Sequence, residues 1–263
     1  MTDAQSMASP DLDGSPILPG HKAVLELLEE RPSQIAKIYC LRKLRERAKL
    51  ESLARRAGVP LEFRDQEGLD TLLPAGDRRV AHQGLVAILS RANLIPEADL
   101  LQSAASAPLP LILALDQVQD PGNVGTLCRS AYALGAAGLL LPTHGSASLG
   151  PAAFKSSMGA LAKMPVAIAT NLSRCLDQAE ELGLAIYGAG RLEAGPTEDA
   201  FSFAWALPAV LVLGGEQKGL RPGVAKRCSL GVEIPFKRPF DSLNIAQAGA
   251  MLLGLCARAQ LSP

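Results

Sequence analysis

The sequence predicts an α/β protein in which a mostly parallel sheet is covered by helices on both faces, with a second, smaller α/β domain before it. Short aliphatic runs alternate with segments of helical periodicity along the C-terminal half of the chain. Hydrophobic residues make up 48% of the 263 residues and aromatic residues only 4%, which is typical of an aliphatic α/β core. A stretch rich in Ala, Ser and Pro, residues 90–110, separates the two parts.

The N-terminal elements follow one another as a compact α/β unit. Residues 1–19 are expected to be a flexible tail, and apolar residues at helical spacing begin at His21. Strands are expected over 34–41, 59–63 and 80–89, and a helix over 43–57 that ends at Gly58. We therefore predict an N-terminal domain over 20–90 and a linker over 91–107, in which 98–105 could form a short helix.

Beyond residue 107 the alternation becomes regular, which predicts a domain over 108–263. Strands are expected over 111–115, 138–141, 165–169, 184–188, 209–213 and 230–234. Helices are expected over 124–135, 151–158, 171–182, 221–227 and 242–258. Strands that alternate with helices in this way favour a mostly parallel sheet.

The net charge limits how the protein could bind a polyanion, and the cysteine content indicates its redox compartment. The formal net charge is zero, so a polyanion would have to be held by local clusters of Lys and Arg. Cys40, Cys128, Cys175, Cys228 and Cys256 show no CxxC spacing, which argues against a disulfide framework and a zinc site. We expect no secretory signal and no membrane-spanning segment, and hence a cytoplasmic protein.

Three polar loops follow predicted strands, where parallel sheets bind their ligands. In the first loop, residues 116–129, Asn123 is expected to cap a helix. Gly125 and Arg129 would share a face of that helix, so that the missing side chain leaves room for a substrate beside the guanidinium. The alternative is a capped structural helix with a surface arginine.

The second and third loops carry the other polar candidates. Residues 214–220 are rich in glycine, so their backbone could approach a ligand closely, but they lack the spacing of a phosphate-binding P-loop and could also form a plain tight turn. In the third loop, residues 235–244, Lys237 and Arg238 could pair with phosphate. Asp241, Ser242 and Asn244 could cap the last helix, or Ser242 and Asn244 could bind a ligand.

Three motifs resemble a known family in order and spacing. They are Asp120-Pro-Gly-Asn-Val-Gly-Thr-Leu-Cys-Arg129, Leu213-Gly-Gly-Glu-Gln-Lys-Gly-Leu220, and Ile234-Pro followed by Ser242-Leu-Asn-Ile245. They resemble the signature motifs of the SpoU (TrmH-like) RNA 2′-O-methyltransferases of the SPOUT class. Gly20-His-Lys-Ala-Val-Leu-Glu and His82-Gln-Gly-Leu-Val-Ala are similar to segments of the branch that methylates guanosine in 23S rRNA.

The resemblance implies a homodimer, a deep trefoil knot in the C-terminal domain, and S-adenosylmethionine as the cofactor, with no metal. The backbone around Gly214, Ile234 and Leu243 would hold the cofactor, together with Gly215, Gln217, Gly219, Pro235 and Asn244. The reaction centre would contain Asn123, Arg129, Glu216, Ser242 and Asn244. Because an arginine keeps its proton, we expect Arg129 to bind phosphate and stabilise the developing alkoxide rather than act as the base.

The chain departs from the family pattern at two places. After Asn244 it has Ile245-Ala-Gln where the family often has a further Ser, and residues 236–240 replace a more usual Met-x-Gly. The implied activity is methyl transfer to a ribose 2′-hydroxyl, most specifically of a guanosine in 23S rRNA. The alternatives are a transfer-RNA target and a catalytically silent RNA-binding or ribosome-assembly protein. A dehydrogenase is disfavoured because no strand is followed by GxGxxG.

Basic residues are concentrated between positions 42 and 56, in an otherwise neutral chain. This concentration suits contacts with the phosphates of folded RNA, although a solvated amphipathic helix is the alternative. The expected RNA-binding residues are Arg42, Lys43, Arg45, Arg47, Arg55 and Arg56. His82 could contact RNA or satisfy a buried hydrogen bond, and we favour the buried hydrogen bond.

Overall fold

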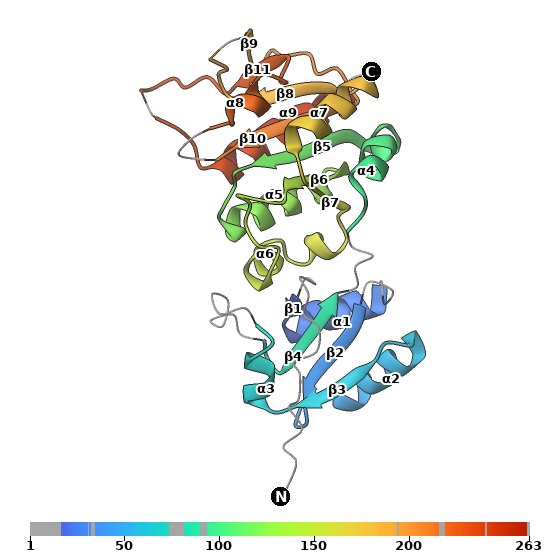
Figure 1. Ribbon diagram of the computed structural model, residues 1–263. Coiled ribbons are helices and arrows are strands. Elements are labelled where there is room, and N and C mark those ends of the chain that lie inside the picture. Colours follow the sequence, from blue (N-terminus) through green and yellow to red (C-terminus); the bar gives the residue numbers. More distant parts are fainter. Residues whose placement is uncertain are drawn as a thin grey trace, which may run out of the picture. The chain divides into compact units, whose positions relative to one another are not determined.

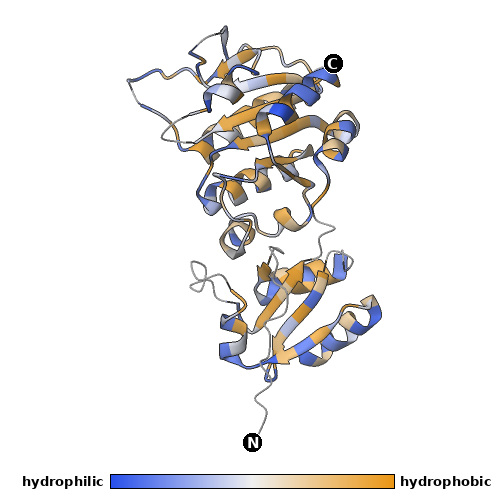
Figure 2. Ribbon diagram, in the orientation of Figure 1, coloured by the Kyte–Doolittle hydropathy of each residue, from blue (hydrophilic) through white to orange (hydrophobic). Residues whose placement is uncertain are grey.

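The chain forms two compact units, residues 1–91 and residues 92–263, which we call the N-terminal and the C-terminal unit (Figure 1). The computed structural model describes residues 17–30, 32, 35–73, 82–89, 94–193, 195–215, 219–239 and 241–261. Hydrophobic residues predominate in the strands of both units (Figure 2). Among the helices that these ranges include, none has both the length and the apolar character that a membrane crossing requires.

The N-terminal unit is built on a mixed sheet of four strands in the order β1-β4-β2-β3. Strand β4 runs antiparallel to both of its neighbours, whereas β2 and β3 are parallel. The elements are β1 (Ile17–Pro19), α1 (His21–Glu30), β2 (Ile35–Leu41), α2 (Arg47–Ala57), β3 (Leu61–Arg64), α3 (Gln66–Asp70) and β4 (Leu85–Leu89).

Three features of this unit differ from the sequence prediction. Residues 17–19, which we expected to end a flexible tail, form β1, because Ile17 and Leu18 are apolar and bury their side chains beside β4. Helix α2 begins at Arg47 rather than at residue 43, since residues 42–46 form a turn. Helix α3, which was not predicted, is fixed by Asp65, whose carboxylate accepts the amide proton of Gly68.

The C-terminal unit contains a seven-stranded sheet in the order β7-β6-β5-β10-β8-β11-β9 (Figure 1). Every pair of neighbouring strands is parallel, which confirms the predicted sheet. The strands are β5 (Leu109–Asp116), β6 (Ala136–Pro142), β7 (Val166–Ala169), β8 (Ala185–Ala189), β9 (Thr197–Asp199), β10 (Ala209–Gly214) and β11 (Leu230–Glu233). The short edge strand β9 was not predicted.

Helices cover both faces of this sheet, as predicted. They are α4 (Glu97–Ser103), α5 (Pro121–Ala133), α6 (Pro151–Ser156), α7 (Leu172–Glu181), α8 (Pro222–Ala225) and α9 (Ile245–Leu261). On one face, α4, α7 and α8 bury residues such as Leu100, Leu176 and Val224 against the strands. On the other face, α9 approaches α5 and β10 so closely at Gly249 that a Cβ atom there would meet Leu127 and Leu213.

Part of the segment predicted as a linker packs within the C-terminal unit. Helix α4 buries Leu100 and Leu101 in the core that it shares with the sheet. Because all strands of this sheet run in one direction, the loops that follow β5, β8, β10 and β11 leave at the same edge. That edge is where the polar motifs of the sequence meet.

Candidate active site

A pocket of about 290 Å³ lies where β8, β10 and β11 end and α9 begins. Backbone and aliphatic side chains form most of its walls, and three charged residues complete them. The lining residues are Ala189, Gly190, Arg191, Leu213, Gly214, Gly215, Val232, Glu233, Ile234, Phe236, Asp241, Ser242, Leu243, Ile245, Ala248 and Leu252. The second and third predicted loops therefore meet in one cavity, at the edge of the sheet where ligands are expected.

Many of the expected site residues lie at this pocket. Its lining includes Gly214, Gly215, Ile234 and Leu243 from the expected cofactor set, and Ser242 from the expected catalytic set. The other described members of the two sets do not line it, although Pro235 lies between the lining residues Ile234 and Phe236. Glu216 and Gln217 lie outside the described residues.

Close backbone packing explains the glycines of the second loop. A Cβ atom at Gly214 would collide with the backbone of Gly219, and one at Gly215 would lie 2.6 Å from the carbonyl oxygen of Gln117. Gly219 has φ +61° and donates its amide proton to the oxygen of Gly215 at 2.8 Å. The start of the loop therefore packs directly on the first loop, and larger residues there would force the two loops apart.

A buried ion pair joins the first loop to the end of the second. Asp116, the last residue of β5, is fully buried, and its carboxylate accepts hydrogen bonds from the backbone amide of Arg221 at 2.8 Å and from the guanidinium Nε at 2.7 Å. Sequence reasoning missed this contact. A charged residue at the end of an aliphatic strand was the available signal, but its partner lies 105 positions away.

Asn244 connects the third loop to the first. Its side-chain amide donates to Oδ1 of Asn123 at 3.2 Å, and its own Oδ1 accepts the amide protons of Ala246 at 3.0 Å and Gln247 at 3.4 Å. Asn244 therefore caps α9 and holds Asn123 at the same time. Two expected catalytic residues from distant motifs are thus in direct contact.

One capping prediction was wrong, and one of the alternatives for the other helix is confirmed. Helix α5 begins at Pro121 and is capped by Asp120, whose carboxylate accepts the amide proton of Gly122 at 2.9 Å, so Asn123 is inside the first turn. Helix α9 begins at Ile245, so Asn244, one of the three candidates, is its cap, and Asp241 and Ser242 are not. In α5 the neighbouring Asn123 has a capping propensity similar to that of Asp120, which explains why the cap was placed three residues too late.

The space predicted beside Arg129 is filled by protein. Gly125 is buried, and a Cβ atom there would collide with Ser156 Oγ and with the carbonyl oxygen of Ala153. The missing side chain therefore allows α6 to pack against α5 and does not make room for a substrate.

Replacing Gly125 by alanine is expected to destabilise the protein by about 2 kcal/mol, because the added methyl group overpacks the α5–α6 contact. Thermal unfolding should show a melting temperature lower by roughly 4–8 °C. Gly254→Ala is the matched control, since this exposed residue of α9 has no neighbouring atom within 4 Å. That change should stabilise the protein by about 0.5–1 kcal/mol, and equal effects of the two changes would contradict the packing role of Gly125.

Arg129 is exposed on α5 and does not line the pocket. Thr126 and Ser130, which flank it along the helix, direct their hydroxyl groups to backbone carbonyls of α5. Within the described part of the chain, no side chain forms an ion pair with the Arg129 guanidinium. Its charge is therefore available to an anionic ligand such as a phosphate.

The groups that line the pocket suit a ligand with an apolar ring and charged ends. Ile234 and Leu243 make no backbone hydrogen bond with another described residue, so their amide and carbonyl groups can bind a ligand. Glu233 and Asp241 supply negative charge and Arg191 positive charge beside aliphatic walls. S-adenosylmethionine, with its adenine ring, sulfonium, ammonium and carboxylate, matches this set. Sequence reasoning missed residues 189–191, although they follow the carboxyl end of β8.

The cysteines near the site are not suited to nucleophilic catalysis. All five thiols are free and buried. Burial raises the pKa of Cys128 in α5 and of Cys256 in α9 to about 12, so neither forms a thiolate near neutral pH. The absence of a disulfide framework agrees with the sequence prediction.

In the N-terminal unit, the predicted RNA-binding residues lie in the turn before α2 and on that helix, and all six side chains are exposed. Arg47 is held in place, since its Nε donates to Glu51 at 2.8 Å and its guanidinium lies 4.2 Å from the centre of the Phe63 ring. For Arg42, Lys43 and Arg45, no described residue supplies an ion-pair partner. The cluster thus combines one guanidinium held by Glu51 and Phe63 with several exposed charges.

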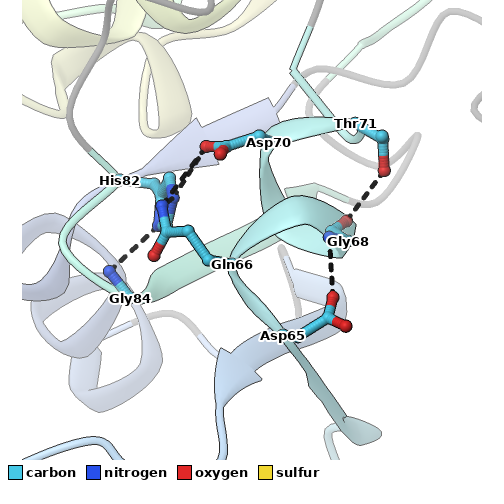
Figure 3. A network of polar contacts seen from close by, with 7 residues as sticks. All are labelled: Asp65, Gln66, Gly68, Asp70, Thr71, His82 and Gly84. Carbon is cyan, nitrogen blue, oxygen red and sulfur yellow. Dashed lines mark hydrogen bonds and ion pairs between the residues drawn. The ribbon is translucent and has the colours of Figure 1, made fainter.

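His82 is buried within a polar network of the same unit (Figure 3). Its Nδ1 accepts the amide proton of Gly84 at 3.0 Å, so we infer that the neutral ring carries its proton on Nε2. That nitrogen lies 3.1 Å from Asp70 Oδ1 and 2.8 Å from the amide group of Gln66, both in α3. The favoured prediction of a buried hydrogen bond is confirmed.

Two protein-family models match the chain. The SpoU rRNA Methylase family matches residues 110–254, which is more than half of the chain, and the RNA 2′-O ribose methyltransferase substrate binding family matches residues 17–94. The first match includes all three motifs and the pocket.

Curated relatives match most of the chain. A 23S rRNA (guanosine-2′-O-)-methyltransferase RlmB of Xanthomonas axonopodis pv. citri is 36% identical over 214 residues, which cover 81% of this chain and 83% of the relative. An uncharacterized tRNA/rRNA methyltransferase of Mycobacterium ulcerans is 34% identical over 241 residues, which cover 91% of this chain and 76% of the relative.

Solved structures share the fold over nearly the whole chain. The SpoU methyltransferase AviRb of Streptomyces viridochromogenes, in complex with the cofactor AdoMet, has a TM-score of 0.74 at 23% identity, with 98% of this chain and 96% of that chain covered. An AdoMet-bound rRNA methyltransferase of Sinorhizobium meliloti has a TM-score of 0.74 at 24% identity, with 96% and 90% covered. With the fold, both family models and the curated relatives in agreement, the chain belongs to the SpoU rRNA methylase family.

Proposed function

We propose that the protein transfers a methyl group from S-adenosylmethionine to the ribose 2′-hydroxyl of a guanosine in 23S ribosomal RNA. The observation that carries this proposal is the meeting of the second and third motifs in one pocket, with the first motif attached through Asn123 and Asn244. Membership of the family supports RNA 2′-O-methylation and this cofactor, and the RlmB relative supports the guanosine and the 23S target.

The pocket residues would bind the cofactor, which supplies an activated methyl group on a sulfonium. The backbone of Ile234 and Leu243 would bind the adenine and ribose edges, and Gly214 and Gly215 would allow close approach. Gln217, Gly219 and Pro235 would shape the pocket beside them. Because the methyl group must be approached in line by the attacking oxygen, positioning by these residues supplies much of the acceleration.

The reaction centre would lie beside the Asn123–Asn244 contact. These two amides would orient the ribose, together with Ser242 and Glu216. Arg129 would bind the neighbouring phosphate and stabilise the 2′-alkoxide as it forms, since its guanidinium is exposed and keeps its charge. A water molecule or a carboxylate would then accept the proton, because an arginine is too weak a base.

The N-terminal unit would bind the RNA through Arg42, Lys43, Arg45, Arg47, Arg55 and Arg56, which are exposed. This assignment gives residues 20–90 to RNA binding and residues 108–263 to catalysis, with the connecting segment between them. The reducing cytoplasm would be the compartment, in keeping with five free thiols.

The protein would act as a homodimer, with a deep trefoil knot in each C-terminal unit. Support for a second copy comes from Arg129, which does not line the pocket of its own chain, and from the large apolar side chain of Met251, which is exposed on α9. Sedimentation of the purified protein at micromolar concentration would show a species of twice the mass of the 27.5 kDa chain. A monomer under these conditions would contradict this part of the proposal.

Incubation with labelled S-adenosylmethionine and transcribed 23S rRNA tests the reaction. We expect label at a single ribose 2′-oxygen of a guanosine, located by mapping 2′-O-methyl groups, and no label in transcribed 16S rRNA. Label in transfer RNA instead would favour the tRNA alternative. Binding of RNA without any heat of binding for S-adenosylmethionine would favour the catalytically silent alternative and contradict the proposed reaction.

A further inference from the structure

The turn before β4 in the N-terminal unit holds one exposed side chain in an unusual backbone conformation. Gln83 has φ +51°, in the left-handed region that residues other than Gly and Asn rarely adopt. Its side chain is exposed, whereas the flanking His82 and Gly84 are buried. A turn of this kind persists only where its surroundings fix it.

Two sets of contacts fix the turn on either side of Gln83. On one side, the His82 ring accepts the amide proton of Gly84 and is itself held by Asp70 and Gln66 of α3 (Figure 3). On the other side, the Gly84 carbonyl accepts the amide proton of Leu41 at 2.9 Å. The backbone that carries Gln83 is therefore anchored to a helix and to a strand.

The same anchor places Gln83 beside the basic turn. Strand β2 is antiparallel to β4, with Cys40 opposite Leu85, and Leu41 is bonded to Gly84. Arg42 follows Leu41 at the end of β2, and Gln83 precedes Gly84 at the start of β4. The two residues therefore lie at the same end of the sheet. A Cβ atom at Gly84 would lie only 3.0 Å from Leu44, so the two turns are packed against each other.

This surface carries two kinds of group, exposed cations and one neutral amide. Arg42, Lys43 and Arg45 offer exposed cations, which bind phosphate without reading sequence. Gln83 carries no charge, but its carboxamide offers a donor and an acceptor in one plane, which matches the edge of a nucleobase. Gln83 therefore presents a neutral amide from an anchored backbone beside exposed cations, which suits contact with a base and with its phosphates.

We propose that Gln83 hydrogen-bonds the edge of an unpaired nucleobase of the RNA while the neighbouring cations bind its phosphates. This inference rests on the proposed function, since it takes the RNA substrate as given. Gln83 would then determine which RNA the protein prefers, whereas the cations would supply the affinity that is common to all RNA. The His82 network would hold the backbone of Gln83 in place.

Substitutions at Gln83 test the role of its side chain separately from that of its backbone conformation. Gln83→Gly removes the amide while a glycine accepts φ +51° without strain, so the melting temperature should stay within about 2 °C of the wild type. Gln83→Asn keeps a carboxamide in a residue type that tolerates the left-handed region. Arg42→Ala, at the adjacent position of the basic turn, is the contrasting variant.

The experiment compares binding of the full-length variants to transcribed 23S rRNA and to a short RNA duplex of unrelated sequence, across a series of salt concentrations. For Gln83→Gly we expect the preference for 23S rRNA over the duplex to fall roughly tenfold, with an unchanged salt dependence. For Arg42→Ala we expect both affinities to fall alike and the slope of log affinity against log salt to decrease by about one. Gln83→Asn should retain part of the preference.

The outcomes distinguish this inference from the proposed function. If the wild-type protein prefers 23S rRNA and Gln83→Gly keeps the full preference, base recognition by Gln83 is overturned and the proposed function stands. If the wild-type protein shows no preference for 23S rRNA, both are overturned. A reduced salt slope for Gln83→Gly would also contradict the inference, because it would indicate a phosphate contact.

Discussion

Replacement of Arg129 by alanine should lower the rate of methyl transfer by at least about 100-fold while the dissociation constant for S-adenosylmethionine changes less than about threefold. The guanidinium is exposed on α5 and lies outside the pocket lining, so its loss should not disturb the bound cofactor. What is lost is the charge that would hold the RNA phosphate and stabilise the alkoxide. Single-turnover transfer with labelled cofactor and calorimetry measure the two quantities separately.

Two further variants sharpen this test. Arg129→Lys keeps the positive charge but not the planar fork of donors, so its rate should fall between those of the wild type and the alanine variant. Arg174→Ala, which removes an exposed arginine of α7, controls for a general loss of surface charge and should leave the rate unchanged. A fully active Arg129→Ala enzyme would refute the assigned role.

The second large effect is expected for Arg221→Ala, which removes the partner of Asp116. The carboxylate of Asp116 has no solvent exposure, and the variant would leave it with the backbone amide of residue 221 as its remaining known donor. An unpaired buried charge should lower the free energy of unfolding by about 3 kcal/mol, because Arg221 itself is partly exposed and the loss falls at the lower end of the range for buried pairs. Thermal unfolding should show a melting temperature lower by roughly 6–12 °C.

Arg227→Ala is the matched control for this prediction. Arg227 pairs with Asp177 through two hydrogen bonds of 2.7 and 2.9 Å, a geometry close to that of the Asp116–Arg221 pair, but the Asp177 side chain is 45% exposed whereas that of Asp116 is fully buried. Its loss should therefore change stability little. Arg221→Ala should also weaken binding of S-adenosylmethionine, because the pair fixes the exit of the glycine-rich loop. Equal melting temperatures for the two variants would contradict the importance of burial.

The sheet of the C-terminal unit was predictable because its strands are nearly continuous aliphatic runs separated by helices. Strands β5, β6, β7, β8, β10 and β11 were all expected within a few residues of their observed limits. The short elements β1, β9 and α3 were missed, since three to five residues are too few to establish a period. The stabilising contacts of such elements come from the tertiary fold.

The location of the site could be predicted from the sequence, but the contacts between its residues could not. The rule that ligands bind at the carboxyl ends of parallel strands located two walls of the pocket, and the same rule would have found residues 189–191. The cap of α5 was misassigned because Pro121, which favours the first helical position, was not weighed against Asn123. No sequence pattern could show the pairing of Asp116 with Arg221, because their meeting depends on strand order.

The last wall of the pocket is supplied by the segment from Asp241 to Leu252, late in the chain. Translation proceeds from the N-terminus, so the strands β5 to β11 are synthesised before this wall. A nascent polypeptide that ended before Ile245 would have its complete set of strands but no enclosed cavity. The growing protein can therefore close its binding site only after all of these strands have been made.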